Sequence, residues 1–379
     1  EFLAKMPFKV PLDATVASMA AGEKQKLEIL KQIYTRRRFL ILDEPTSVLT
    51  PQEADEILGM LRAMARQGEI SILLITHKFR EVLAFTDEVT VLRRGRLAGH
   101  GNPHKLGVDE MARMMVGSQD IPPPAERSGA PAATRLEIAG MRANNDIGEV
   151  IVKGLDLSVR SGEIVGIAGV SGNGQRQLVE VLAGQRDAVG GEIRVHGEAY
   201  HGRREEMRRH KIACLPEEPL RSASVPKMSV EENLALRVFD LPPYALGGWW
   251  LNREPFHRNA ERLIEQYRIK TAGPSAPIAT LSGGNVQRTV LARELSSDVD
   301  VLVVSNPCFG LDFAAVADIR GQIVAARNRG AAVLLVSEDL DEIFELADRI
   351  VVMFDGTIRY ETPTESADRM VVGRHMAGH

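Results

Sequence analysis

A glycine-rich run between residues 169 and 174 is the part of the sequence best suited to chemistry. It follows the apolar run from Glu163 to Ala168, and apolar residues return at helical spacing after Gln177. A strand, a glycine loop and a helix in this order let backbone N–H groups and the start of the helix face an anion, typically a phosphate. The candidate phosphate-binding residues are Gly169, Ser171, Gly172, Asn173, Gly174 and Gln175.

The elements around this loop belong to an internal repeat. On the early side, a helix with apolar residues at helical spacing opens near Gly22, and an apolar strand, 39–42, leads into Asp43-Glu44-Pro45. On the late side, a similar helix opens near Gly284, and the strand 301–304 leads into Ser305-Asn306-Pro307. The same order of strands, helices and turns predicts two homologous domains.

The spacings within the two copies agree closely. The interval from Gly22 to Asp43 equals the interval from Gly284 to Ser305. The interval from Asp43 to His77 is one residue longer than the interval from Ser305 to Glu338. The two copies therefore differ in length by a single residue over this span. Chance does not explain such close agreement in spacing.

The early copy has no glycine loop of its own. In the late copy the loop ends at Gly174, well before Gly284, and the same interval counted back from Gly22 falls ahead of residue 1. The chain also begins Glu1-Phe2-Leu3 without a methionine. We therefore expect an N-terminally truncated first domain.

A proline-rich stretch without aromatic residues divides the chain. Residues 118–135 contain four prolines, and this composition is typical of a linker. We expect the C-terminal portion of a first domain at 1–117, the linker at 118–135 and a second domain at 136–379.

The composition indicates a globular chain with no general affinity for polyanions. Of the 379 residues 44% are hydrophobic and 26% are charged, which suits more than one buried core. The net charge of −4 provides no basic field to hold nucleic acid. Two cysteines are too few for a disulfide framework and suit a reducing compartment. No apolar run approaches the ~20 residues of a membrane helix, so we expect no direct membrane insertion.

Together these motifs resemble the ATP-binding-cassette (ABC) family of P-loop NTPases. Leu281-Ser282-Gly283-Gly284-Asn285 is similar to the family's signature, and Phe39 to Ser47 is similar to its Walker B strand and following loop. His77 occupies the position of the family's switch histidine. The paired copies and the loop 169–175 resemble the ATPase subunits of bacterial nucleoside and sugar importers of the ribose type. The resemblance implies an α/β fold of two ABC domains in tandem, the first incomplete, with ATP and Mg²⁺ as cofactors.

In the resembled family each ATP site is shared between two domains, because one supplies the loop and Walker B and the other supplies the signature. The resemblance implies that Asp43 holds the metal and that Glu44 and His77 are catalytic. Opposite them would lie the nucleotide-binding signature residues Ser282, Gly283, Gly284 and Asn285.

The second composite site has lost its reactive groups. Gln175 and Arg176 stand where the family has lysine and a hydroxyl residue, and Ser305 and Asn306 replace the acidic pair. Glu338 replaces the switch histidine. We expect this site neither to organise Mg²⁺ nor to activate water. Its backbone donors are compatible with weak nucleotide binding, and the alternative is a turn that keeps the fold without binding nucleotide.

The resemblance implies an ATPase subunit that energises an importer for nucleosides or simple sugars, and we expect the 379-residue chain alone to be inactive. The implied partners are two transmembrane permease subunits and, through them, an extracytoplasmic substrate-binding protein. The implied location is the cytoplasmic face of the inner cell membrane, as a peripheral subunit. The alternatives are a soluble tandem ABC protein that acts on ribosomes or DNA, and a non-catalytic nucleotide-binding fragment. We expect no nucleic-acid partner, because the net charge is negative.

Overall fold

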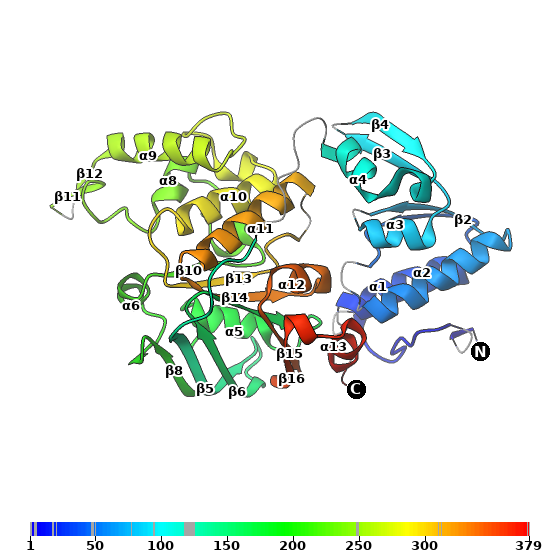
Figure 1. Cartoon of the computed structure of the whole chain (residues 1–379), viewed down its shortest axis with the longest axis horizontal. Helices are drawn as coiled ribbons and strands as arrows, with labels where there is room; N and C mark the ends of the chain where they lie inside the picture. Colours follow the sequence, from blue (N-terminus) through cyan, green and yellow to red (C-terminus); the bar gives the residue numbers. More distant parts are fainter. Residues whose placement is uncertain are drawn as a thin grey trace.

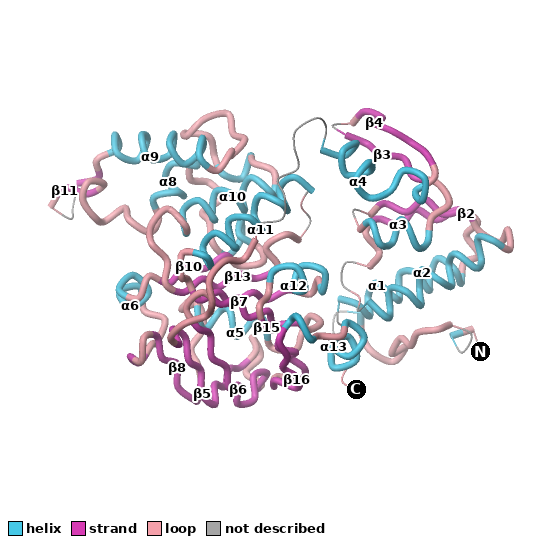
Figure 2. Tube along the Cα trace, in the orientation of Figure 1, coloured by secondary structure: helices cyan, strands magenta, loops and turns pink. Residues whose placement is uncertain are grey.

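The computed structural model describes two groups of elements, which lie on the right and the left of Figures 1 and 2. We call them the first half, up to residue 116, and the second half, from residue 126. The described residues are 2–3, 6–16, 19, 21–46, 49, 51–76, 78–93, 95–116, 126–247, 250–309, 311, 313–376 and 378.

The centre of the second half is a six-stranded sheet in the order β10-β13-β14-β7-β15-β16. All neighbours are parallel except the edge strand β16, which pairs antiparallel with β15. Every residue of β7, β13 and β14 is buried. Parallel strands that are covered on both faces consist of nearly continuous apolar residues, as these three do. The strands are β7 (Glu163–Ala168), β10 (Ile212–Leu215), β13 (Val301–Ser305), β14 (Ala332–Ser337), β15 (Arg349–Phe354) and β16 (Thr357–Pro363).

Two layers cover this central sheet. On one face, alternate strand residues such as Val303 and Leu334 pack against a smaller antiparallel sheet and helix α5. That layer consists of β5 (Thr134–Asn144), β6 (Val150–Arg160), β8 (Gly190–Val195), β9 (Glu198–Ala199) and α5 (Gln175–Leu182). On the other face, Leu302 and Val333 belong to the core formed with the helices. These helices are α8 (Val230–Ala235), α9 (Arg253–Gln266), α10 (Gly283–Glu294), α11 (Phe313–Asn328), α12 (Leu340–Leu346) and α13 (Arg369–Met376). The remaining elements are α6 (Arg204–Arg209), α7 (Pro219–Ser222), β11 (Ala245–Leu246), β12 (Trp250–Leu251) and 3₁₀ turns at 278–280 and 364–366.

The first half contains two separate two-stranded sheets, a parallel pair β1–β2 and an antiparallel pair β3–β4. Its strands are β1 (Phe39–Asp43), β2 (Ser71–Ile75), β3 (Val89–Arg93) and β4 (Arg96–Gly101). Its helices are α1 (Ala21–Tyr34), α2 (Pro51–Arg66), α3 (Phe79–Phe85) and α4 (Pro103–Val116). Leu61 of α2 is almost fully buried in the core that α1 and α2 form against β1.

The strand pairs of the two halves have the same register. Asp43 pairs with Ile75 in β1–β2, and Ser305 pairs with Val336 in β13–β14, as the repeat spacing predicts. The antiparallel pairs also agree, because the register shifts after Val91 in β3 and after Val352 in β15.

The halves differ in what lies between these strand pairs. In the second half β7 joins β14 to β15, whereas the described part of the first half has no strand between β2 and β3. A groove of about 870 Å³ lies there instead, lined by residues such as Leu74 and Val91. The face of β1–β2 that lies opposite α1 and α2 is also exposed to solvent. Its residues Phe39, Ile41, Leu73 and Ile75 are 47–62% exposed.

The predicted strands at 39–42, 163–168 and 301–304 are confirmed to within one residue. The predicted linker is only partly described, because residues 117–125 lie outside the described part. Residues 126–133 follow the surface of the second half, where Ser128 N–H donates to Asn328 Oδ1 at 2.9 Å. Strand β5 begins at Thr134, inside the stretch predicted as linker.

Candidate functional site

The glycine loop joins the end of β7 to the start of α5 at the carboxyl edge of the central sheet. Gly172 and Gly174 have φ values of 94° and 103°, a left-handed conformation that side chains disfavour. Asn173 fixes the loop to the turn after β15. Its Oδ1 accepts from Asp355 N–H at 2.8 Å, and its carbonyl accepts from Gly356 N–H at 3.1 Å. The backbone of the loop is therefore held in place before any anion arrives.

The side chains of the loop bond within it. Gln175 Nε2 and Asn173 Nδ2 both donate to the Val170 carbonyl, at 3.1 and 3.0 Å. Gln175 is buried and lies over Gly169, where a Cβ would be 2.1 Å from Gln175 Nε2. Arg176 forms an ion pair with Glu180, with 2.7 Å between Nε and Oε1. The loop thus offers backbone N–H groups to a phosphate but no cation of its own from position 175.

Two carboxyl groups lie beside the loop. Burial and, to a smaller extent, the nearby charge of Glu217 raise the pKa of Glu338 to about 7, although a hydrogen bond from Ser171 acts in the opposite direction. Burial also raises the pKa of Glu217, whereas its hydrogen bond with Asn306 lowers it. Glu338 N–H donates to Asn306 Oδ1 at 3.0 Å, which fixes the start of this loop. Two acidic side chains, Glu217 and Glu338, therefore lie beside the glycine loop, where cations would stabilise the negative charge of a triphosphate.

The residues at the end of β13 differ from the usual donors to Mg²⁺. Ser305 and Asn306, at the end of β13, are buried and carry no carboxylate to hold a cation. In the part of the chain that the structure describes, no group of three His, Cys, Asp or Glu side chains is placed to hold a metal ion. This holds for the first half as well, so the expectation that the second half cannot organise Mg²⁺ stays a prediction.

The first half keeps the acidic pair. Asp43 ends β1, and Glu44 follows with a φ of 43° while its N–H donates to the Ile75 carbonyl at 2.9 Å. Asn306 has the same φ of 43°, and its N–H donates to Val336 at 2.8 Å. The two halves therefore share one backbone geometry here, but only the first has carboxylates at these two positions, which suit Mg²⁺ and the orienting of water. His77 lies outside the described residues.

The predicted signature begins helix α10. Ser282 is the N-cap residue, and Ser282 and Gly283 are exposed, so the first N–H groups of the helix are open to an anion. Asn285 Nδ2 donates to Ser282 Oγ at 2.8 Å. A Cβ at Gly284 would lie 3.3 Å from the end of the Leu311 side chain, a tight contact that Leu311 would relieve only by shifting.

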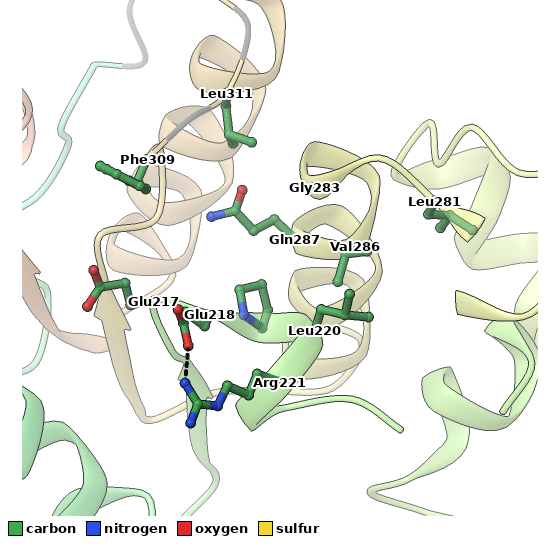
Figure 3. Close-up of a pocket in the computed structure, with 11 residues that line it drawn as sticks. Glu217, Glu218, Leu220, Arg221, Leu281, Gly283, Val286, Gln287, Phe309 and Leu311 are labelled. Atoms are coloured by element: carbon green, nitrogen blue, oxygen red, sulfur yellow. Dashed lines mark hydrogen bonds and ion pairs between the residues drawn. The ribbon is translucent and has the colours of Figure 1, made fainter. Parts of the chain in front are cut away.

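A cavity of about 360 Å³ lies beside this helix start (Figure 3). It is lined by residues 217–221, Leu281, Gly283, Val286, Phe309 and Leu311. Gln287 reaches from α10 into the same space. All of its lining residues belong to the second half. The largest contacts between the halves run through α4 against α11 and α2 against α13. The pairing of Glu44 with Ser282 is not among these contacts and stays a prediction.

Sequence reasoning did not find the pairing of Glu217 with Glu338. Glu217 follows β10 and Glu338 follows β14, and these strands are separated only by β13 in the sheet. The sheet order was the missing information, because the carboxyl ends of parallel strands meet at one edge.

A buried parallel sheet with a glycine loop between a strand and a helix defines a P-loop nucleotide-binding domain. The comparisons specify it further. The sequence profile of the ABC transporter family matches residues 152–308. The chain is 39% identical over 374 residues to the glucose import ATP-binding protein TsgD13 of Haloferax volcanii, covering 98% of this chain and 68% of that protein. The chain belongs to the ABC transporter family.

Further relatives and solved structures agree with this family. The nucleoside import ATP-binding protein NupA of Lactococcus lactis is 36% identical, over 97% of this chain and 72% of that protein. A solved ATP-binding subunit of an ABC transporter has a TM-score of 0.53 at 18% identity, over 64% of this chain and 100% of that chain, which shows the fold alone. Domains of this family bind ATP, with Mg²⁺ as the usual cation. No helix among the described residues is both long and apolar enough to cross a membrane.

Proposed function

We propose that this chain is the ATP-binding subunit of an importer for nucleosides or simple sugars. Its relatives include a glucose import protein, a nucleoside import protein and a ribose import protein, all aligned over almost the whole chain. The subunit would act at the cytoplasmic face of the cell membrane. Its partners would be two permease subunits and, through them, an extracytoplasmic substrate-binding protein.

Within this subunit, we propose two cassettes in tandem, with bounds near 1–117 and 136–379. The common register of β1–β2 and β13–β14 supports this, as does the common φ of Glu44 and Asn306. The exposed face of β1–β2 and the groove between β2 and β3 support an incomplete first cassette. In the second half the equivalent face lies beneath the layer of β5, β6 and α5. Covering each half-exposed side chain would contribute on the order of 1 kcal/mol.

One composite site would hydrolyse ATP. In it Asp43 would hold Mg²⁺, Glu44 would orient or deprotonate water, and His77 would donate to the γ-phosphate. Across the interface, Ser282 and the start of α10 would face the same phosphate. The observation that carries this proposal is the division of residues: carboxylates end β1, whereas Ser305 and Asn306 end β13 in the same geometry.

The catalytic assignment is tested by two matched substitutions in a form of the subunit whose first cassette carries a phosphate loop, assembled with its permease. We call this complex the assembled importer. We expect Glu44→Gln to lower ATP turnover by at least about 100-fold, because the water loses its base. We expect Asn306→Ala, at the same place in the other cassette, to change turnover by less than about twofold. Equal losses would overturn the ranking of the two sites.

The 379-residue chain alone should bind ATP without turning it over, because its described first half has no phosphate loop to complete the site. Robust Mg²⁺-dependent hydrolysis by this chain would contradict the proposal that its first cassette is incomplete and its second site inactive. Uptake of labelled nucleosides and sugars by cells that lack the subunit and are complemented with it distinguishes the two substrate classes. Copurification with ribosomes instead of permeases would contradict the importer.

A further inference from the structure

A buried carboxylate in the first half connects the two loops that carry the proposed catalytic residues. Glu81, in α3, is fully buried, and Thr46 is 1% exposed. The hydroxyl of Thr46 donates to Glu81 Oε1, and the hydroxyl of Thr76 donates to Oε2 at 3.0 Å. The ammonium of Lys78 lies 3.8 Å from Oε1 and donates to the Thr46 carbonyl at 3.4 Å. Every oxygen of this buried charge therefore has a partner.

The two hydroxyl groups come from sites next to the proposed chemistry. Thr46 is two residues after Glu44, and Thr76 immediately precedes His77. The N–H of Glu44 also donates to the Ile75 carbonyl. The loops after β1 and β2 are therefore joined both by this backbone hydrogen bond and by the hydrogen bonds to Glu81. A carboxylate with fixed geometry between them limits how far the two loops can move apart.

The second half contains the same arrangement in a weakened form. Glu342 takes the place of Glu81, and Ser337 Oγ donates to its Oε2 at 2.8 Å. Cys308 takes the place of Thr46, so a thiol, which is a weaker donor than a hydroxyl, faces Glu342 and lowers its pKa. The distances and angles at Oε1 of Glu342 do not reach those of an ordinary hydrogen bond. The nearest cation is Arg320, with 3.8 Å between its Nε and Oε1. Burial accordingly raises the pKa of Glu342.

We propose that Glu81 is a positioning residue for ATP hydrolysis, which holds the Glu44 loop against the loop that carries His77. We call Thr46, Thr76, Lys78 and Glu81 the carboxylate clamp. This inference rests on the proposed composite site and adds a residue that touches neither nucleotide nor water. Two hydroxyl groups donate to the buried Glu81 in the half that keeps the acidic pair, and one donates to Glu342 in the other half. We expect this difference if the clamp serves hydrolysis.

The mildest perturbation is Thr46→Val, because valine has the shape of threonine and lacks the hydroxyl donor. Displacement of a catalytic group by about an ångström lowers turnover strongly while nucleotide contacts remain. We expect Thr46→Val to lower kcat for ATP about tenfold in the assembled importer, with KM for ATP within about twofold. We expect Thr46→Ser, which keeps the hydroxyl, to restore kcat to within about twofold of the unsubstituted subunit.

The matched control is Cys308→Val, which changes the equivalent position in the other half. We expect it to leave kcat within about twofold. Glu81→Gln and Glu342→Gln form a second pair with the same expected division. The thermal midpoint of every variant is measured in the 379-residue chain, and turnover is assayed well below the lowest midpoint so that all variants are folded.

The outcomes separate the clamp from the site on which it rests. An unchanged kcat in Thr46→Val, a loss confined to KM, or an equal loss in Cys308→Val would overturn the positioning role. Glu44→Gln is assayed beside them. Its inactivity together with normal Thr46→Val turnover would reject only the clamp, whereas its full activity would reject the composite site and the clamp together.

Discussion

Nucleotide binding at the glycine loop of the second half should weaken as the pH rises through 7. Glu338 is held beside the loop by Ser171, and Glu217 is its charged neighbour. Glu218 and Arg176 act in turn on Glu217. A protonated Glu338 can donate to a phosphate oxygen, whereas the ionised group repels it, so the protonated form is the one that binds.

The size of the effect follows from the pKa of Glu338, which is raised to about 7. At pH 6 about 90% of this group is protonated, and at pH 8 about 10% is. If only the protonated form binds, the affinity falls about tenfold between these values, or about 1.4 kcal/mol. Glu338→Gln keeps a neutral donor at every pH and should bind with almost constant affinity.

The assay is the titration of a fluorescent ATP analogue into the 379-residue chain from pH 6 to pH 8, without Mg²⁺. ATP itself titrates in this range, so the ratio between the unsubstituted chain and Glu338→Gln isolates the protein group. A Glu218→Gln variant controls for a carboxylate lost farther from the loop. Equal pH slopes in the chain and in Glu338→Gln would refute the reasoning.

Three further predictions concern the second half. The pKa of Glu338 is raised, so its ionisation lowers the stability of the folded state as the pH rises from about 4.5 to 7. Glu338→Gln should therefore raise the free energy of unfolding in urea by up to about 3 kcal/mol at pH 8, and should not raise it at pH 4. Gln175→Lys should raise ATP affinity about tenfold by calorimetry, because it replaces an amide bonded to Val170 with a cation. Glu294→Gln should lower the free energy of unfolding by about 3 kcal/mol, because Arg237 loses its buried carboxylate; an unchanged urea midpoint would contradict this.

The central sheet could be predicted because its strands are continuous apolar runs of the right length. β7 matches the predicted range 163–168, and the register of β1–β2 follows from the spacing of the copies. The start of β5 could not be predicted. Thr134 and Arg135 are polar and follow a proline-rich stretch, and Thr134 is held by pairing with Arg160, a partner that local composition does not reveal.

The site was predictable in its residue types and not in its contacts. The loss of lysine at Gln175 is visible in the sequence, but its hydrogen bond to Val170 depends on how the loop folds over Gly169. The proximity of Glu217 and Glu338 depends on the sheet order. A pattern of residue types therefore gives the donors available to a ligand, whereas their charges and partners require the fold.

The substitutions in the second half form a physically connected set. On the proposed division of the two sites, the second half has no acidic pair to orient water, and Glu338 stands at its switch position with no hydrolysis to assist. Under the same proposal the loops after β13 and β14 position no reactive groups, and Cys308 stands where Thr46 donates in the first half. The glycine loop stays ordered because Asn173 still joins it to the turn after β15. In the proposed arrangement, the second cassette would keep a phosphate-binding loop and the signature that the first cassette needs, and it would bind nucleotide while the first cassette hydrolyses it.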